Sequence, residues 1–340
     1  MFEIFIITSD NGYKVTGLLL VLNERNGKSG VTLWDKHITL VRNCAQLKMV
    51  LIRQTNGGFQ TMIKRYFTDD IFKRVNTDFA FLMKLIKSSK GELDFAIRDD
   101  YFNLYYKGNS LAKVSFKKNE GYEISIHKAF FSGSKAEQDK RFNFVKGQDN
   151  SGNYFIGLLK KDLLHPFFQQ KYLYDFCRKI KSHNYGEEIV FEQNLITDNI
   201  NKENVLFIDR QITDNVLKGK RMDLLALKQV EADNFQFLVC EVKLGNNPEL
   251  KIKVASQLND YLSHINDNFK DYKACYEKQY EQKKELGLFD FPNFKNIKII
   301  PPVEGLIIVG GYSGIAKVQI DTLRKNYPNL SVRPFFHELP

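Results

Sequence analysis

The segment FQFLVCEVKLG, which ends at Gly245, is a long apolar run interrupted by two charges, Glu241 and Lys243. Successive side chains of a strand point to opposite faces, so these two charges share one face of the segment. Burying an unpaired charge costs several kcal/mol, and a strand keeps such charges only where something compensates them. The segment therefore predicts a buried strand whose end carries functional chemistry.

The segments around this strand predict a mixed sheet flanked by helices, an α/β domain. Strand-like runs are NVLFIDRQI, RMDLLALK and GLIIVGG. Helical patterns are HPFFQQKYLYDFCRKIKS, YGEEIVFEQNLITDN, a long helix beginning near Pro248, and a helix from about Ile315 to Asn326. A polar, charged stretch, EQKKELGLFDFPNFKN, separates the last two elements from the long helix. Helices alternating with strands in this order are typical of α/β proteins.

The first third of the chain has a different character. Short strand-like runs, FEIFIIT, KVTGLLLVLNE, GVTLWDKHITLV and MVLIRQ, alternate with turns. A helix is expected from Asp69 to Ser89, followed by the hairpin YFNLYYKGNSLAKVSF and the strand YEISIHKAFF. A polar stretch between Ser132 and Tyr154 is typical of a connection. We expect a β-rich, α+β N-terminal domain at 1–135, a linker at 136–165 and the α/β domain at 166–340.

The chain carries 50 Lys and Arg against 40 Asp and Glu, a formal charge of +10. This excess is compatible with a polyanionic partner such as DNA. In the hairpin, Lys107, Lys113 and Lys117 alternate with aromatic residues. Such a surface can follow a phosphate backbone and stack bases. The alternative is a solvated face on which lysines protect an exposed edge strand.

Several classes of protein are disfavoured by the sequence. No apolar run approaches the roughly 20 residues that a membrane helix needs, and the N-terminus lacks the pattern of a signal peptide. Cys44, Cys177, Cys240 and Cys275 lie far apart and form no CxxC pair, so a zinc site is not indicated. We expect reduced thiols in a cytoplasmic protein without membrane contact.

Acidic residues accompany the charged strand. Asp223 begins the preceding strand, and a hairpin between the two strands would bring Asp223 to the Glu241 end. Two carboxylates at one sheet edge repel each other unless a cation lies between them, and oxygen ligands suit Mg²⁺ or Mn²⁺. Lys243 would then reach a substrate phosphate or an attacking water. On this interpretation Glu241 and Lys243 are half of a hydrolytic site and not a buried salt bridge.

Two helices add candidates. Gln257 and Tyr261 are four residues apart in the long helix and share one face, from which they can hold substrate or Lys243. In the earlier helix, Glu188 and Glu192 are also four apart and offer a third carboxylate.

Taken together, RMD, the strand-borne EVK and the helix-borne QLNDY resemble the PD-(D/E)XK, or restriction-endonuclease-like, nuclease superfamily. The similarity covers about residues 170–325. It is to the branch of the superfamily that has Gln and Tyr four residues apart. This sequence has MD where the name of the superfamily has PD. The resemblance implies a restriction-endonuclease-like core. Asp223, Glu241 and the Val242 carbonyl would be metal ligands, and Lys243 would orient the water. Gln257 and Tyr261 would position the site.

The resemblance also implies a glutamate from the first helix. Glu187, Glu188 and Glu192 compete for this role, and Glu188 is our choice. Among basic residues, Arg210 and Arg221 either contact phosphate or pair with local charges.

Two further features have simple explanations. The loop VGGYSG, from Gly310 to Gly314, either cradles a phosphate or makes a tight turn. We expect His183 and His264 to be solvated on the surface.

The function expected from the sequence is a Mg²⁺- or Mn²⁺-dependent deoxyribonuclease, an endonuclease of restriction, anti-phage defence or repair. RNA is a less favoured substrate than DNA. The N-terminal domain would bind substrate or a partner protein, or form a homo-oligomer. The alternative is a non-catalytic nucleic-acid-binding or assembly protein that keeps the nuclease fold.

Overall fold

The chain divides into two compact units, Met1–Thr61 and Met62–Pro340. The computed structural model describes residues 4–8, 20–25, 28–33, 48–52, 63–119, 121–147, 152–183, 186–200, 202–214, 217, 220–289 and 296–337. The boundaries expected at 135 and 166 therefore differ from this division, since both fall within the second unit. Cys44 lies outside the described residues.

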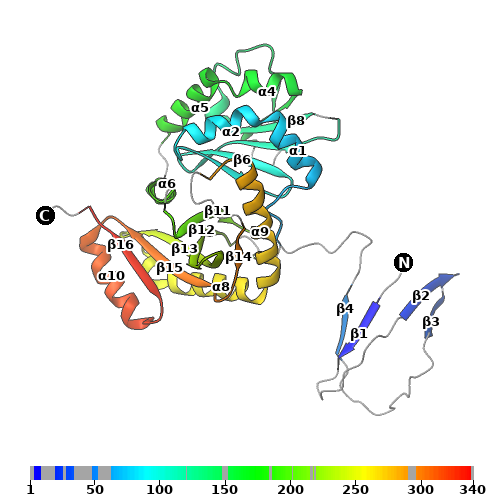
Figure 1. The fold of residues 1–340 in the computed structure, drawn as a ribbon, viewed down its shortest axis with the longest axis vertical. Helices are drawn as coiled ribbons and strands as arrows, with labels where there is room; N and C mark the ends of the chain where they lie inside the picture. The colour runs from blue at the N-terminus through cyan, green and yellow to red at the C-terminus, as the bar shows by residue number, and fades with distance from the viewer. Residues whose placement is uncertain are drawn as a thin grey trace. The chain divides into compact units, whose positions relative to one another are not determined.

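The described residues of the first unit form two strand pairs (Figure 1). β1 (Ile4–Thr8) pairs with β4 (Lys48–Ile52), and β2 (Leu20–Arg25) pairs with β3 (Lys28–Leu33). Both pairs are antiparallel. Each strand overlaps one of the four strand-like runs of the sequence, so the expected β character of this segment is confirmed.

The second unit begins with a six-stranded antiparallel sheet in the order β5-β6-β7-β8-β10-β9. Its strands are β5 (Leu93–Ile97), β6 (Tyr101–Tyr106), β7 (Asn109–Phe116), β8 (Tyr122–His127), β9 (Phe144–Lys146) and β10 (Tyr154–Leu159). Its helices are α1 (Asp69–Asp78), α2 (Ala80–Ser88), α3 (Lys128–Phe131), α4 (Lys161–Phe167) and α5 (Gln170–Ser182). The expected linker at 136–165 thus supplies β9 and β10, and it is part of this sheet.

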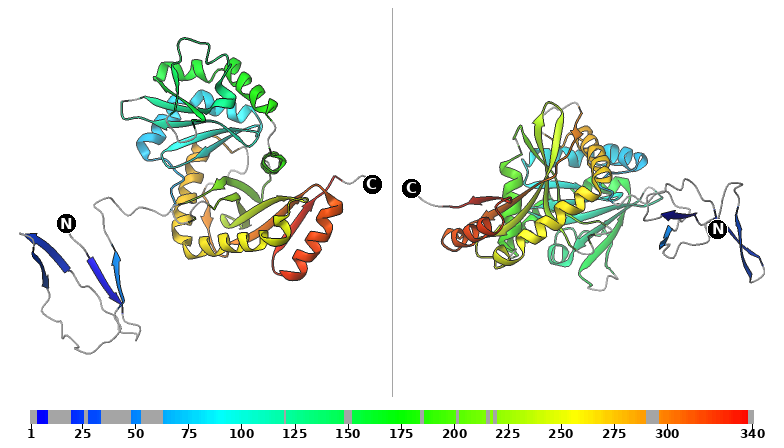
Figure 2. Two further views of the ribbon diagram at one scale, coloured as in Figure 1. Left: turned by 180° about the vertical axis from the view of Figure 1, so that it is seen from behind. Right: turned by 90° about the horizontal axis from the view of Figure 1, so that it is seen from below.

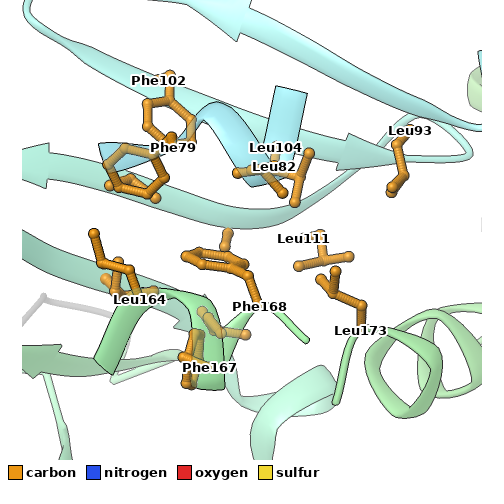
Figure 3. Packing of buried hydrophobic residues seen from close by; sticks show 14 of the residues in the cluster. Phe79, Leu82, Leu93, Phe102, Leu104, Leu111, Leu164, Phe167, Phe168 and Leu173 are labelled. Atoms are coloured by element: carbon orange, nitrogen blue, oxygen red, sulfur yellow. The ribbon is translucent and has the colours of Figure 1, made fainter. Parts of the chain in front are cut away.

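An aromatic core joins these helices to the sheet. Phe79 and Phe102 meet edge to face with ring centroids 5.1 Å apart, and Phe167 and Phe168 meet in the same way at 5.1 Å. Figure 3 shows these rings and the leucines around them converging from both sides of the core. Burial of large aromatic side chains is a major source of stability, so this sheet with its helices has a core of its own.

A second, mixed sheet follows in the order β11-β12-β13-β15-β16. Its strands are β11 (Val205–Ile212), β12 (Met222–Glu231), β13 (Asn234–Leu244), β15 (Glu304–Gly310) and β16 (Ser331–Phe335), with the short β14 (Lys298–Ile299) beside β13. The first three strands are antiparallel, and β13, β15 and β16 are parallel. This part of the chain is therefore the mixed α/β structure that the sequence predicts.

Helices lie on both faces of the mixed sheet (Figures 1 and 2). They are α6 (Glu187–Asp198), α7 (Glu249–Ile252), α8 (Val254–Asp267), α9 (Phe269–Glu285) and α10 (Ser313–Asn326). One face of β13 packs Phe237 and Val239 into a core that includes α8, whereas Cys240 and Val242 pack with Leu195 of α6 on the other face. The alternation expected for this strand is confirmed. None of the described helices is long and apolar enough to cross a membrane.

The structure differs from the expected helices at two places. The long helix expected from Pro248 is divided at Lys253 into α7 and α8. The next helix, α9, extends into the stretch expected to be merely polar, because Tyr272, Tyr276 and Tyr280 recur at a spacing of four and are buried on one face.

α9 also connects the two sheets. Gln282 donates to the carbonyl oxygen of Phe67 at 2.9 Å, and its own amide oxygen accepts the Phe67 N–H at 2.9 Å. Arg98, at the end of β5, donates to a carboxylate oxygen of Asp209 on β11 and to the Arg210 carbonyl at 2.9 Å. These buried polar contacts explain why the two sheets belong to one compact unit.

Candidate active site

The hairpin of β12 and β13 brings the expected acidic residues together. Leu224 pairs with Cys240, which places Asp223 at the Glu241 end of the neighbouring strand. The Val242 N–H donates to Oδ2 of Asp223 at 2.9 Å. The predicted approach of Asp223 to Glu241 is therefore confirmed, and it follows from the local pairing of two adjacent strands.

Lys243 lies among three carboxylates. Its Nζ donates to Oε1 of Glu241 at 2.8 Å and to the Val242 carbonyl at 3.0 Å. Oδ2 of Asp223 is 3.6 Å from the same nitrogen, and Oε1 of Glu188 is 3.7 Å away. Side chains from two strands and from α6 thus meet at the end of the hairpin.

Glu241 and Lys243 form a buried ion pair, with only 2% and 4% of their surface exposed. The interpretation that excluded a buried salt bridge was wrong. The two side chains share one strand face, and the long lysine stem lets the ammonium turn back to the carboxylate. The pair remains unusual, because buried ion pairs are stable only when their geometry offsets the loss of hydration.

The electrostatics of the cluster show a shortage of positive charge. Burial and then the nearby Asp223 raise the pKa of Glu241 to about 8, and burial also raises the pKa of Asp223. Burial alone would lower the pKa of Lys243, but Asp223 and Glu241 overcome this effect and the pKa is raised. A site in which carboxyl groups hold their protons this strongly would gain from a further cation.

The three candidate glutamates of α6 have different partners. Glu188 lies in the cluster and accepts a hydrogen bond from Asn247 at 3.2 Å. Glu187 accepts one from the Tyr312 hydroxyl at 2.5 Å. Glu192 pairs with Arg210 at 3.2 Å, and burial, then Asp223, raises its pKa to about 7. Only Glu188 among these three contacts Lys243 within ion-pair distance in the described structure, in agreement with the choice made from the sequence.

Tyr261 extends from α8 beside the cluster, and Gln257 lies one turn earlier on the same helix. The Tyr261 hydroxyl donates to the Arg221 carbonyl at 3.0 Å. Burial and then the charges of Glu241 and Asp223 raise the pKa of Tyr261 to about 12. Tyr261 therefore fixes the chain entering β12 and does not hold Lys243. Within the described residues, Oε1 of Gln257 and Oε2 of Glu241 are buried without a hydrogen-bond partner.

These residues can be compared with the needs of a divalent metal. The described ranges contain no group of three or more His, Cys, Asp or Glu side chains arranged to hold a metal ion. The donor chemistry nevertheless fits a hard cation, because Asp223, Glu241 and the Val242 carbonyl offer only oxygen. The unpartnered buried Oε2 of Glu241 is the observation that favours such an ion.

Two of the four candidate nucleic-acid contacts, Lys113 and Lys117, have local partners. The Lys113 ammonium lies 4.2 Å from the centroid of the Tyr101 ring, and Lys117 pairs with Glu123 at 2.7 Å. Lys107 lies in the turn between β6 and β7, and Arg221 is exposed at the start of β12.

Two of the aromatic residues expected to stack bases in the hairpin do not reach the surface. Tyr105 and Tyr106 are buried, and Tyr106 is part of the aromatic core. The expectation of a base-stacking surface is wrong for these two rings, because Tyr106 packs in the aromatic core and Tyr105 lies under the buried guanidinium of Arg210.

Other residues chosen from the sequence have structural roles. His264 is only 11% exposed in its side chain and binds Asp214, so the expectation of a solvated histidine is wrong here. His183 is exposed at the end of α5, as expected. Gly311 and Tyr312 adopt positive φ angles of 63° and 51° just before α10. This geometry supports the tight-turn interpretation of the VGGYSG loop.

A buried polar cluster near the site could not be recognised from the sequence. Oε1 of Gln193 accepts hydrogen bonds from Arg210 Nη1 at 2.6 Å and from the Gly108 N–H at 3.1 Å. Nε2 of Gln193 donates to the Gly91 carbonyl at 2.9 Å. Arg210 is 1% exposed, so it pairs with local groups and is not placed to contact phosphate. The cluster fixes α6, the helix that carries Glu188.

Comparisons of the chain with protein-family models, with curated proteins and with solved structures found no match. The class of protein is therefore defined by fold and site alone. It is a mixed α/β protein whose β-hairpin end brings Asp223, Glu241 and Lys243 together with Glu188 of a neighbouring helix.

Proposed function

We propose that this protein is a Mg²⁺- or Mn²⁺-dependent deoxyribonuclease with a restriction-endonuclease-like core. The observation that carries the proposal is the convergence of Asp223, Glu241 and Glu188 on the ammonium of Lys243 at the end of one hairpin. A lysine held among carboxylates, with one buried carboxylate oxygen unpartnered, is costly as mere structure. The same arrangement of a lysine among carboxylates is useful at a site that binds a metal cation and a phosphate group.

Each residue has a definite part in this proposal. Asp223, Glu241 and the Val242 carbonyl would hold the metal, which supplies an activated water and charge neutralisation at phosphate when bound. The Lys243 ammonium orients the attacking water and stabilises negative charge on the phosphate. Glu188 borders the reacting groups, Gln257 of α8 would position the substrate, and Tyr261 fixes the chain that carries Asp223.

The net charge of +10 favours a polyanionic substrate, and Arg221 is exposed next to Asp223 to meet it. We propose DNA as the substrate of an endonuclease acting in restriction, anti-phage defence or repair in the cytoplasm. The part of the chain that precedes the mixed sheet would bind the substrate, a partner protein or a second copy of the chain.

The decisive experiment compares Asp223→Asn and Glu241→Gln with the wild-type protein on plasmid, linear duplex and single-stranded DNA and on RNA, with Mn²⁺ and with a chelator. We expect Mn²⁺-dependent DNA cleavage by the wild type and its loss in both variants, while the unfolding transition is kept. Asp260→Asn, which changes an exposed carboxylate paired with Lys220, is the matched control and should cleave normally. Unchanged cleavage by either site variant would end the assignment.

A second candidate is a nucleic-acid-binding or assembly protein that keeps this fold without turnover. The observation in its favour is that Lys243 already supplies Glu241 with a buried partner at 2.8 Å. Calorimetry separates the two functions. Saturable heat on addition of Mn²⁺, lost in Glu241→Gln, supports the nuclease, and DNA binding without metal binding supports the second candidate.

A further inference from the structure

A cavity of about 740 Å³, including its open mouth, lies where the antiparallel sheet meets the mixed sheet. One wall comes from α2 and β5, and the other from α6, β11 and the end of α9. Most of the lining is apolar, with Phe95, Ile196, Leu206, Phe207, Leu288 and Phe289 as its main members. Open, largely apolar cavities between structural layers are common ligand sites, and this one contains none of the residues of the candidate active site.

Lys283 of α9 is the unexplained group in this cavity. The residue is 7% exposed, and its Nζ donates to the Ile208 carbonyl at 2.7 Å. An ammonium has three N–H donors, yet this carbonyl is its single hydrogen-bond acceptor in the described structure, and no described carboxylate is within 4.0 Å. Burial lowers the pKa of Lys283 even though Asp94 and Asp209 oppose the effect. A methionine would fill the same space without the cost of burying a charge.

Asp94 of β5 borders the same cavity and a smaller adjoining pocket that Lys283 also lines. Its backbone pairs with Tyr105 in the sheet, and its carboxylate accepts no hydrogen bond from a described group. A cationic donor and an anionic acceptor thus lie near each other in a cavity walled by aromatic rings. Their charges cancel, so this pair is suited to a neutral polar ligand and not to a strongly charged one.

We propose that this cavity binds a nucleobase with a lactam edge, the ring carbonyl beside a ring N–H that uracil, thymine and guanine share. Lys283 donates to the ring carbonyl, and Asp94 accepts from the ring N–H. The aromatic and aliphatic side chains of the lining pack against the faces of the flat ring. At the corresponding edge adenine and cytosine present an amino donor beside an acceptor ring nitrogen, so donor and acceptor are exchanged relative to the lactam. Turning the ring over restores the match with Asp94 and Lys283 but carries the attached sugar to the opposite side of the cavity.

The base can come from a free nucleoside or from a nucleotide within a single strand, and the experiment separates these sources. Calorimetric titrations of the full chain use guanosine, uridine, thymidine, adenosine and cytidine, then single strands of thymidine or adenosine nucleotides. The titrations are made without divalent metal, so the result does not depend on nuclease activity. We expect saturable binding of the lactam bases. Adenosine and cytidine should bind at least about tenfold more weakly, which is the discrimination typical of one base contact made through two hydrogen bonds.

Variants test the two polar groups. Lys283→Met should weaken lactam-base binding about tenfold or more, and Asp94→Asn, a change of similar shape, should remove the preference over adenosine and cytidine. Lys278→Met is the matched control, because Lys278 lies on the same helix and is partly exposed beside Asp69. If Lys283→Met fails to fold, Asp94→Asn decides alone. The proposal is overturned if no base binds as a nucleoside or within a single strand, or if all five nucleosides bind equally. It is also overturned if the folded variants bind the lactam bases as the wild type does.

Discussion

Oε1 of Gln193 lies 2.6 Å from Nη1 of Arg210, and both side chains are buried between α6 and β11. The same glutamine binds Gly108 and Gly91, in two turns of the antiparallel sheet. α6 is thus tied on one side to β11 and on the other to the antiparallel sheet. Because Glu188 lies near the start of α6, these hydrogen bonds set its position relative to Lys243.

Gln193→Ala tests this positioning role. The change leaves donors of Arg210 and Gly108 without their acceptor, and buried unsatisfied donors cost about 1–3 kcal/mol each. We expect a loss of stability of this order in urea unfolding and at least a tenfold lower cleavage rate at saturating DNA. Asn266→Ala, which removes an exposed side-chain amide bound to the Leu262 carbonyl, should change neither. A Gln193→Ala protein that is less stable but cleaves normally would separate α6 from catalysis.

The raised pKa of Glu241 predicts a pH-dependent stability. Burial and then Asp223 raise this pKa from 4.5 to about 8, so the folded protein keeps the proton to higher pH than the unfolded chain does. The stabilisation from this group is therefore complete below about pH 4.5 and is lost as the pH rises to about 8. Glu241→Gln should flatten the stability profile across this window by a few kcal/mol, at about 1.4 kcal/mol per pH unit.

Urea unfolding of the wild type and of Glu241→Gln between pH 4.5 and 8.5 gives the free energy of unfolding of each, and the difference between the two measures this effect. Glu304→Gln is the control, since Glu304 is partly exposed and pairs with Lys228 at 2.7 Å. Parallel profiles for the wild type and Glu241→Gln would show that Glu241 titrates as it does in the unfolded chain.

Lys243→Met removes an ammonium that contacts all three carboxylates of the cluster. Breaking one partner out of a buried ion pair costs about 3–5 kcal/mol, so the melting temperature should fall markedly in a chelator. Mn²⁺ should recover part of the loss by supplying positive charge, while cleavage stays absent. Lys228→Met, at a half-exposed pair, should show neither effect. Equal melting temperatures of Lys243→Met with and without Mn²⁺ would argue against a metal site here.

The candidate site was predictable where its geometry is local. Asp223, Glu241 and Lys243 lie on two adjacent strands of one hairpin, and a period of two with a short connection is enough to bring them together. Gln257 and Tyr261 required only the period of a helix. The buried polar cluster around Gln193 was not predictable, because Gly108 and Gly91, to which Gln193 binds, are 85 and 102 residues away along the chain.

The errors in the predicted fold also come from contacts between residues that are distant along the chain. The stretch around β9 and β10 has the Gly- and Ser-rich composition of a connection, and only pairing with β8 makes β10 a strand of the sheet. α9 has a polar surface, and its tyrosines are accepted in the core because their hydroxyls reach carboxylates elsewhere: Tyr272 binds Asp214 at 2.8 Å and Tyr276 binds Asp209 at 3.0 Å. Neither partner is visible in the periodicity of the helix.

Gln257→Met separates function from stability. Oε1 of Gln257 is buried without a partner in the described structure, so replacing the amide by a thioether of similar size removes an unsatisfied acceptor. We expect the free energy of unfolding to stay equal or to rise by up to about 1 kcal/mol, while the cleavage rate falls. The two measurements are urea unfolding and initial rates on plasmid DNA. A large loss of stability would mean that the amide has a structural partner and no direct part in the site.

The division of the chain predicts which fragment folds. Residues 62–340 form one compact unit, and Gln282, Arg98 and Asp209 join its two sheets through buried hydrogen bonds. A fragment of residues 166–340, the domain expected from sequence, loses both Phe67 and Arg98. It also removes Arg65 and Arg98, two arginines that pair with Asp209, and removing one partner of a buried ion pair costs about 3–5 kcal/mol, a large part of the stability of a domain.

We therefore expect residues 62–340 to unfold in one cooperative transition and to keep Mn²⁺ binding. Residues 166–340 should be aggregated or lack a sharp thermal transition. Circular dichroism melting of both fragments beside the full chain measures this directly. Asp209→Asn in the 166–340 fragment is the control, because it removes the uncompensated charge and should recover part of the transition if that charge is the cause. A 166–340 fragment that melts sharply without this change would show that the mixed sheet is stable without the antiparallel sheet.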